Sequence, residues 1–148
     1  MPSHLIDCIK YQEINAPVSA GTNDTDSDII DTQDADGVLF IVPVTDCLNT
    51  GVLTLTMEHS ATNSAGAMVA TTATTAVTSA ADDDLNDKAV ILDVQRPVNR
   101  YVRLNFVSTV ANIATGTVSA IQYKLRDEPA TQGADVAGSA KFVNPASA

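Results

Sequence analysis

Strict alternation of apolar and polar residues is the feature that most limits what this chain can fold into. The segment GVLTLTMEH (51 to 59) places Leu53, Leu55 and Met57 on one face and threonine or glutamate on the other. This period of two residues is typical of a half-buried β-strand. The sequence therefore predicts a core closed by β-sheets rather than by helices.

Other segments carry strand patterns as well. GVLFIVPV (37 to 44) is continuously apolar, which indicates a central strand covered on both faces, with Pro43 marking its end. KAVILDV (88 to 94) and RYVRLNFV (100 to 107) alternate, with Val90, Leu92, Val94, Val102, Leu104 and Phe106 inward. Additional strands are expected in residues 27–32 and 116–125, with weaker patterns in residues 6–11, 14–19 and 67–72. Turn-rich segments between these short strands favour an all-β fold, an antiparallel β-sandwich or jelly roll.

The short segment QRPVN joins two of these strands. Its proline cannot donate to a sheet ladder and its asparagine tolerates turn geometry, so we expect a β-hairpin over residues 90–106. Arg96 and Arg100 fall at its loop and Arg103 on its outward face. We expect Arg103 to pair with Asp93 across the strands, a surface contact worth about 0–1 kcal/mol. For Arg96 and Arg100, an intermolecular role and plain solvation are both open.

Composition and charge narrow the classes of partner. The chain has 148 residues, enough for one domain, and a formal net charge of −10. This charge repels phosphate backbones, so nucleic acid is not an expected partner. Aromatic residues make up only 4% of the chain and Trp is absent, which argues against a platform that stacks bases or sugars.

The absence of a targeting signal and the small number of cysteines lead us to expect a soluble protein made in a cytoplasm. No apolar run near the start is long enough for a signal peptide, and VLFIVPV is too short to span a bilayer, so no membrane partner is expected. Cys8 and Cys47 could pair, but a chain of this size needs no staple, and two buried thiols are the expectation.

No motif for catalysis or for a cofactor stands out. The DTDSD segment (24 to 28) has the opening spacing of a calcium loop, but Ile29 and Ala35 occupy the positions that need glycine and a bidentate carboxylate. The acidic run at residues 82–87 is typical of a solvated loop, and the two histidines share no metal-binding frame. We expect no enzyme activity, no cofactor, no metal and no small-molecule substrate.

The two ends of the chain differ in character from its middle. Residues 1–13 are expected to form an N-terminal arm, residues 14–125 the β-sandwich domain, and residues 126–148 an extended C-terminal tail of small residues. Phe142 and Val143 are candidate anchors by which the tail contacts a neighbour.

The order of segments resembles a known family. The run from APVSAGT through SDIIDTQDADGVLFIVPV and a threonine-rich middle to AVILDVQRPVNRYVRLNF and GTVSAIQYKLRDEPATQ resembles the head decoration, or cement, proteins of tailed bacteriophages. The resemblance covers most of residues 14–132, and its most distinctive pieces are DGVLFIVP, ILDVQRPVNRYVRL and AIQY. It implies a virion protein on the outer capsid surface: a jelly-roll subunit, commonly trimeric, that binds the major capsid protein near three-fold or quasi-three-fold axes and clamps neighbouring capsomers.

The candidate interface residues for such a role are Arg96, Arg100, Tyr101, Phe142 and Val143. A strongly acidic surface leaves binding to a few cations, and extended termini bridge subunits through strand addition or arm exchange. Three alternatives stay open. They are a tail- or baseplate-associated β-sandwich, a carbohydrate-binding module, which the absence of Trp disfavours, and a cupin-type enzyme, which the small number of histidines disfavours.

Overall fold

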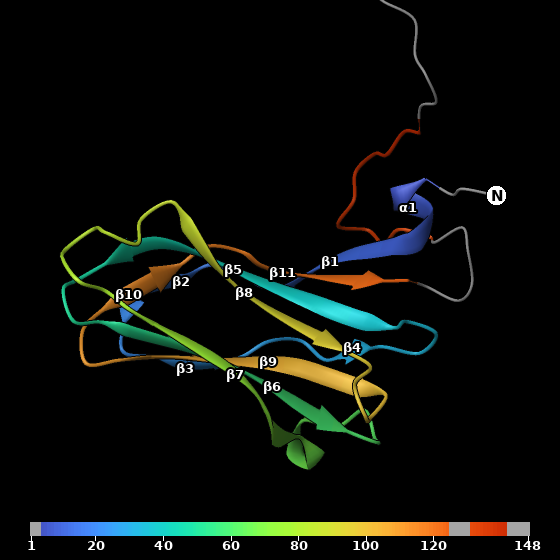
Figure 1. Cartoon of the computed structure of the whole chain (residues 1–148), viewed down its shortest axis with the longest axis horizontal. Coiled ribbons are helices and arrows are strands. Elements are labelled where there is room, and N and C mark those ends of the chain that lie inside the picture. The colour runs from blue at the N-terminus through green and yellow to red at the C-terminus, as the bar shows by residue number, and fades with distance from the viewer. Residues whose placement is uncertain (1–3, 125–130, 142–148) are drawn as a thin grey trace, which may run out of the picture.

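Two antiparallel sheets packed face to face make up the computed structural model, which describes residues 4–124 and 131–141 (Figure 1). The first sheet contains β1 (Ile9–Asn15), β2 (Val18–Gly21), β5 (Gly37–Cys47), β8 (Lys88–Gln95), β10 (Ile113–Thr115) and β11 (Val118–Tyr123). The second contains β3 (Asp24–Asp26), β4 (Ile30–Asp31), β6 (Val52–Ser60), β7 (Val69–Thr78) and β9 (Tyr101–Thr109). The helical elements are α1 (Leu5–Cys8) and the 3-10 turn η1 (Ala65–Ala67), and no helix in the described residues is long and apolar enough to cross a membrane.

The strand order is that of a jelly roll. β1 and β2 continue one another along β11 and β10, these two share one side of β5, and β3 and β4 share one side of β9. When each interrupted pair is counted as one strand, the chain order becomes 1-8-3-6 in the first sheet and 2-7-4-5 in the second. This arrangement of eight strands in two Greek keys confirms the fold class predicted from the sequence.

The core lies between the two sheets and is made of the alternating side chains. In β6 and β9, the side chains predicted to face inward are buried: Leu53, Leu55, Met57, Val102, Leu104 and Phe106. They pack against β5, whose buried side chains include Val38, Phe40, Val42 and Val44. Aliphatic residues therefore fill the interior, with two phenylalanines supplying the aromatic volume.

The predicted hairpin over residues 90–106 is wrong. β8 pairs with β5 in the first sheet, whereas β9 pairs with β6 in the second, so QRPVN crosses from one sheet to the other. Both strands still turn their apolar faces into the common core, which is why their alternation resembles that of a hairpin. Arg96 adopts a positive φ of 52°, a left-handed conformation at the start of this crossing.

Two predicted boundaries also change. The sheet begins at Ile9, inside the segment expected to be an N-terminal arm, because β1 pairs with β11 from Ile9 onward. Pro43 does not end its strand, since β5 continues to Cys47. The Pro43 carbonyl accepts a hydrogen bond from the Gly116 N–H at 2.9 Å, in the gap where β11 gives way to β10. Its nitrogen faces the same gap, so no ladder hydrogen bond is lost.

Candidate interaction surface

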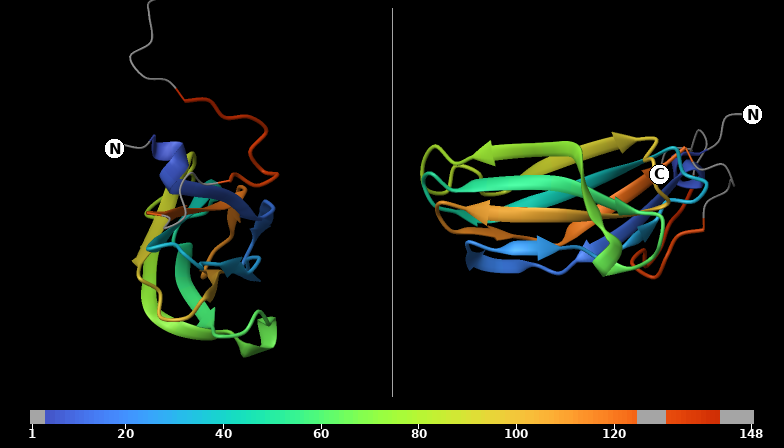
Figure 2. Two further views of the ribbon diagram at one scale, coloured as in Figure 1. Left: turned by 90° about the vertical axis from the view of Figure 1, so that its right-hand side faces the viewer. Right: turned by 90° about the horizontal axis from the view of Figure 1, so that it is seen from below.

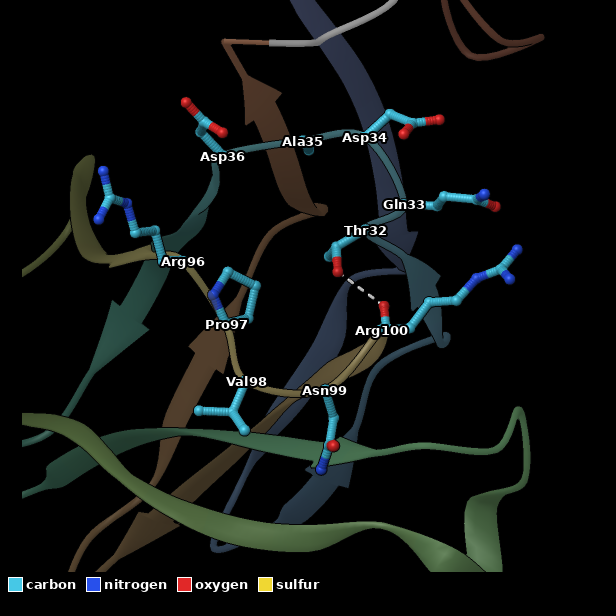
Figure 3. A pocket seen from close by; sticks show the side chains of 10 residues that line it. All are labelled: Thr32, Gln33, Asp34, Ala35, Asp36, Arg96, Pro97, Val98, Asn99 and Arg100. Carbon is cyan, nitrogen blue, oxygen red and sulfur yellow. Dashed lines mark hydrogen bonds between the residues drawn. The ribbon is translucent and has the colours of Figure 1, made fainter.

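The connection between β8 and β9 lies beside the turn at residues 32–36, at one end of the sandwich (Figure 3). The Thr32 N–H and hydroxyl donate to the Arg100 carbonyl at 2.9 and 2.7 Å, and the Arg96 N–H donates to the Asp36 carbonyl at 2.6 Å. These bonds fix both ends of the crossing loop. An open hollow of about 700 Å³ lies between the two segments.

Arg100 is committed to an internal contact. Its guanidinium binds the Asp31 carboxylate in a bidentate manner, with Nε to Oδ1 at 2.8 Å and Nη2 to Oδ2 at 2.7 Å. This pair lowers the pKa of Asp31 and raises the pKa of Arg100 further. The Arg100 guanidinium carbon also lies 5.2 Å from the centre of the Tyr101 ring, a cation–π distance. Arg100 and Tyr101 therefore hold the loop to β4.

Arg96 is the arginine of this surface that remains available. Its guanidinium points away from the hollow in Figure 3, and within the described part of the chain it makes no ion pair. Val98, at the tip of the same loop, is 87% exposed. The loop thus presents one uncommitted cation beside an apolar tip, on a backbone fixed by hydrogen bonds.

The expected pairing of Arg103 with Asp93 is wrong. Arg103 Nε donates to Glu58 Oε1 at 2.7 Å and its Nη2 lies 3.3 Å from Asp26 Oδ2, because its neighbours on β9 are β6 and β3. Asp93 instead accepts a 2.7 Å hydrogen bond from the Tyr123 hydroxyl. Burial of Tyr123, followed by this bond to a carboxylate, raises the pKa of Tyr123 to about 12.

The acidic segments that resemble metal loops are engaged with the protein itself. Asp24 and Asp26 accept hydrogen bonds from Asn105 Nδ2 at 2.6 and 2.9 Å, so two of the three DTDSD carboxylates lie against β9. Asp84 accepts from the Ser79 hydroxyl at 2.7 Å and the Ala80 N–H at 2.8 Å, which lowers the pKa of Asp84. Within residues 4–124 and 131–141, no group of three or more potential metal ligands is gathered.

The two cysteines differ in environment. Cys47 is a buried thiol whose sulfur lies 3.5 Å from the Ser79 hydroxyl and from the Asp84 carboxylate. Cys8 is a half-buried thiol whose sulfur lies 3.5 Å from the His4 carbonyl oxygen. The expectation of a buried thiol thus holds for Cys47, whereas Cys8 is only partly covered.

The described part of the C-terminal tail lies along the outer edge of β1. Gln132 accepts from the Tyr11 N–H at 3.2 Å and donates to the carbonyls of Ile6 and Ile9 at 3.1 and 2.7 Å. Asp135 accepts from the Glu13 N–H at 3.0 Å. Side chains of the tail therefore form hydrogen bonds with main-chain groups of β1 that would otherwise be open to pairing with another strand. Phe142 and Val143, the predicted anchors, lie outside the described residues.

The structure thus brings Arg96, Arg100 and Tyr101 together but gives each a different role. Sequence reasoning missed Asp31 and Thr32, which fix the loop, and Val98, which forms its tip. The one sequence signal for Val98 was its position between a proline and an asparagine, which is typical of a loop.

The chain was also compared with known proteins. The sequence matches no family model, and a search of curated proteins found no match. The likeness to phage decoration proteins accordingly rests on the sequence segments alone.

Proposed function

We propose that this protein is a non-enzymatic structural protein of a tailed-phage virion. In this proposal it is a decoration protein that binds the major capsid protein on the outer head surface, near three-fold or quasi-three-fold axes, as a homotrimer. The observation that carries the proposal is the fixed loop at residues 96–100, which offers Arg96 and Val98 from an otherwise acidic jelly roll.

Electrostatics support a binding role for this loop. With eight basic residues against eighteen acidic ones, the surface repels other acidic proteins except where a cation is exposed. Arg100 and Arg103 are neutralised by Asp31, Glu58 and Asp26. Arg96 can therefore form a bidentate pair with a carboxylate of a partner without breaking an internal contact.

The preorganisation of the loop favours binding as well. The hydrogen bonds at Thr32 and Asp36 hold both ends of the crossing before any partner arrives. A binding loop that is already ordered loses less conformational freedom on association. Val98 then adds an apolar contact beside the charged one, and protein interfaces usually combine apolar contacts with polar ones.

The test is co-sedimentation of the purified protein with undecorated phage heads. We expect saturable binding that weakens with added salt and that falls several-fold in Arg96→Gln. Lys124→Gln is the matched control, because Lys124 is also an exposed cation at a positive φ, 50° against 52° for Arg96. Lys124→Gln should bind as the wild type does.

Two results would overturn the proposal. Absence of saturable binding to heads would exclude the capsid role and leave a tail-associated β-sandwich as the alternative function. Binding of Arg96→Gln at wild-type strength would show that the loop is not the contact.

A further inference from the structure

Four strand edges bound the two sheets, and an unpaired edge is a template for another strand. Natural proteins shield such edges with charge, with short or interrupted strands, or with a covering segment. In this molecule the edges are β1 with β2, and β8, in the first sheet, and β3 with β4, and β7, in the second. They differ sharply in how well they are shielded.

Three of the four edges carry recognisable protection. The side chains of Gln132 and Asp135 cover β1. β3 and β4 have only three and two residues, and between them they carry three aspartates. β8 carries one charge of each sign, Lys88 and Asp93.

β7 lacks these protections. It is ten residues long, VATTATTAVT, with no charged residue and no proline. Its outward side chains, at alternate positions from Ala70 to Thr78, are small and exposed. A bulge lies opposite Met57, where the Thr71 hydroxyl donates to the Met57 carbonyl, but from Thr74 to Thr78 the pairing with β6 is regular. This half of β7 is a long, uncharged edge open to pairing.

The same side of the sandwich is also incompletely buried. β7 and β8 run together along one long side, opposite β1 to β4 (Figure 2). Four of their inward side chains are only partly covered: Ala73, Val77, Val90 and Val94. Val69 is 62% exposed and Ile91 is 58% exposed. Two exposed apolar side chains therefore lie on this side, and a third, Val98, lies beside it.

A hollow of about 340 Å³ lies where β7, the end of β8 and the crossing loop meet. Apolar atoms of Met57, Val94 and Val98 line it. His59 also lines it, and the Nδ1 atom of His59 is buried with no hydrogen-bond partner in the described part of the chain. A buried ring nitrogen without a hydrogen-bond partner is stabilised when a polar group of another molecule bonds to it.

We propose that the long side formed by β7 and β8 is the surface through which copies of this chain associate. The inference deepens the proposed function and rests on its homotrimer. Each copy carries a net charge of −10, so two copies repel one another over most of their surfaces. β7 carries no charge and the charges of β8 cancel, so identical copies meet along these strands with less repulsion than over the rest of their surfaces. The four aspartates of the loop that joins the two strands, Asp82, Asp83, Asp84 and Asp87, lie at one end of this side.

The size of the surface sets the strength of the contact. Ten residues of strand extend about 33 Å, and two stacked sheets are about 10 Å apart, which gives a strip of about 330 Å² in projection. A stable interface buries about 800 Å² on each partner. We therefore expect association to be weak in free solution and to be completed when the copies are held side by side on the head.

The experiment is sedimentation equilibrium of the purified chain across the micromolar to millimolar range, followed by binding to undecorated heads. The test variant is Ala76→Glu, which places a negative charge on β7 of every copy, so that the copies repel one another where these strands meet. Its matched control is Ala20→Glu, the same substitution at an exposed position of β2 on the opposite long side. Ile91→Glu on β8 is a second test variant, and circular dichroism shows that each variant is folded.

We expect wild type and Ala20→Glu to approach three chain masses as concentration rises, while Ala76→Glu and Ile91→Glu remain monomers. Self-association of folded Ala76→Glu and Ile91→Glu at wild-type strength would overturn the inference. So would a wild type that stays monomeric throughout. If heads still bind saturably in either case, the capsid role stands and only the assignment of this surface fails.

Discussion

Gly37→Ala should destabilise the protein by about 2–3 kcal/mol although it adds a single methyl group to a strand. Gly37 begins β5 and lies directly opposite Tyr123 of β11, whose ring covers the glycine. A Cβ atom on residue 37 would lie 2.7 Å from Cε2 of that ring and closer still to Cζ and the hydroxyl oxygen. Carbon atoms pack at about 3.5–4.0 Å, so the ring must move by about 1 Å or more.

That displacement sets the magnitude. Moving the ring breaks the 2.7 Å hydrogen bond between the Tyr123 hydroxyl and Asp93. A hydrogen bond to a charged group contributes about 1.5–3 kcal/mol, and overpacking costs about 1–3 kcal/mol. The two effects overlap, because a ring that moves to relieve the clash loses the bond in the same step. We therefore take a value near the middle of each range rather than their sum.

Urea unfolding provides the assay. The midpoint of Gly37→Ala should fall with the slope unchanged, because the surface exposed on unfolding stays the same. Gly66→Ala is the matched control, since no heavy atom lies within 4 Å of the added Cβ, and its free energy of unfolding should stay within about 0.5 kcal/mol of wild type. In the Tyr123→Ala background, Gly37→Ala should cost much less. Equal midpoints for Gly37→Ala and Gly66→Ala would refute the reasoning.

The titration of Tyr123 gives a second readout of the same contact. The pKa of Tyr123 is about 12 in the folded chain, raised chiefly by burial, against about 10 when unfolded. A raised pKa means that the folded state favours the protonated phenol, so its stabilisation is full below about pH 10 and is lost as pH rises toward 12. In Gly37→Ala, spectrophotometric titration should show this pKa closer to the ordinary value.

Four further substitutions test other contacts. The pKa values of Asp31 and Asp84 are lowered, chiefly by Arg100 and the Ser79 hydroxyl, so their stabilisation is full above about pH 4 and fades as pH falls. In Asp31→Asn and Asp84→Asn, urea midpoints should therefore change less with acid than in wild type. Leu55→Ala, at a fully buried position, should cost about 2–5 kcal/mol in the same assay. Arg103→Met should cost about 1–2 kcal/mol, since the Arg103 side chain is only 12% exposed. An unchanged midpoint would show that its ion pairs contribute nothing.

Strand positions and buried faces could be predicted because they depend on local periodicity. The inward positions of β6 and β9 follow from alternation alone, since only one face of each strand meets the core. The pairing of those strands could not be predicted in the same way. A hairpin and a crossing between sheets both turn the apolar faces of consecutive strands toward one core, and QRPVN suits either connection.

The candidate site was only partly predictable for a related reason. Arg96 and Arg100 could be assigned to a loop, but the partner of Arg100 is Asp31, 69 residues earlier in the chain. Arg103 likewise binds Glu58, 45 residues away. Partners at such separations are set by sheet order, which alternation does not encode. The cover over β1 depends on a glutamine and an aspartate whose positions show no regular pattern.

The pairing of the first and last strands determines how the molecule responds to force. Ile9 at the start of β1 lies opposite Tyr123 at the end of β11, so both termini leave the sheet at the same end. The hydrogen bonds of an antiparallel pair run perpendicular to the strands. Tension between the termini would break the hydrogen bonds of the β1–β11 pair one after another, and a low force would suffice. A force along β5, which is hydrogen-bonded on both sides, would load all of its hydrogen bonds in shear at once.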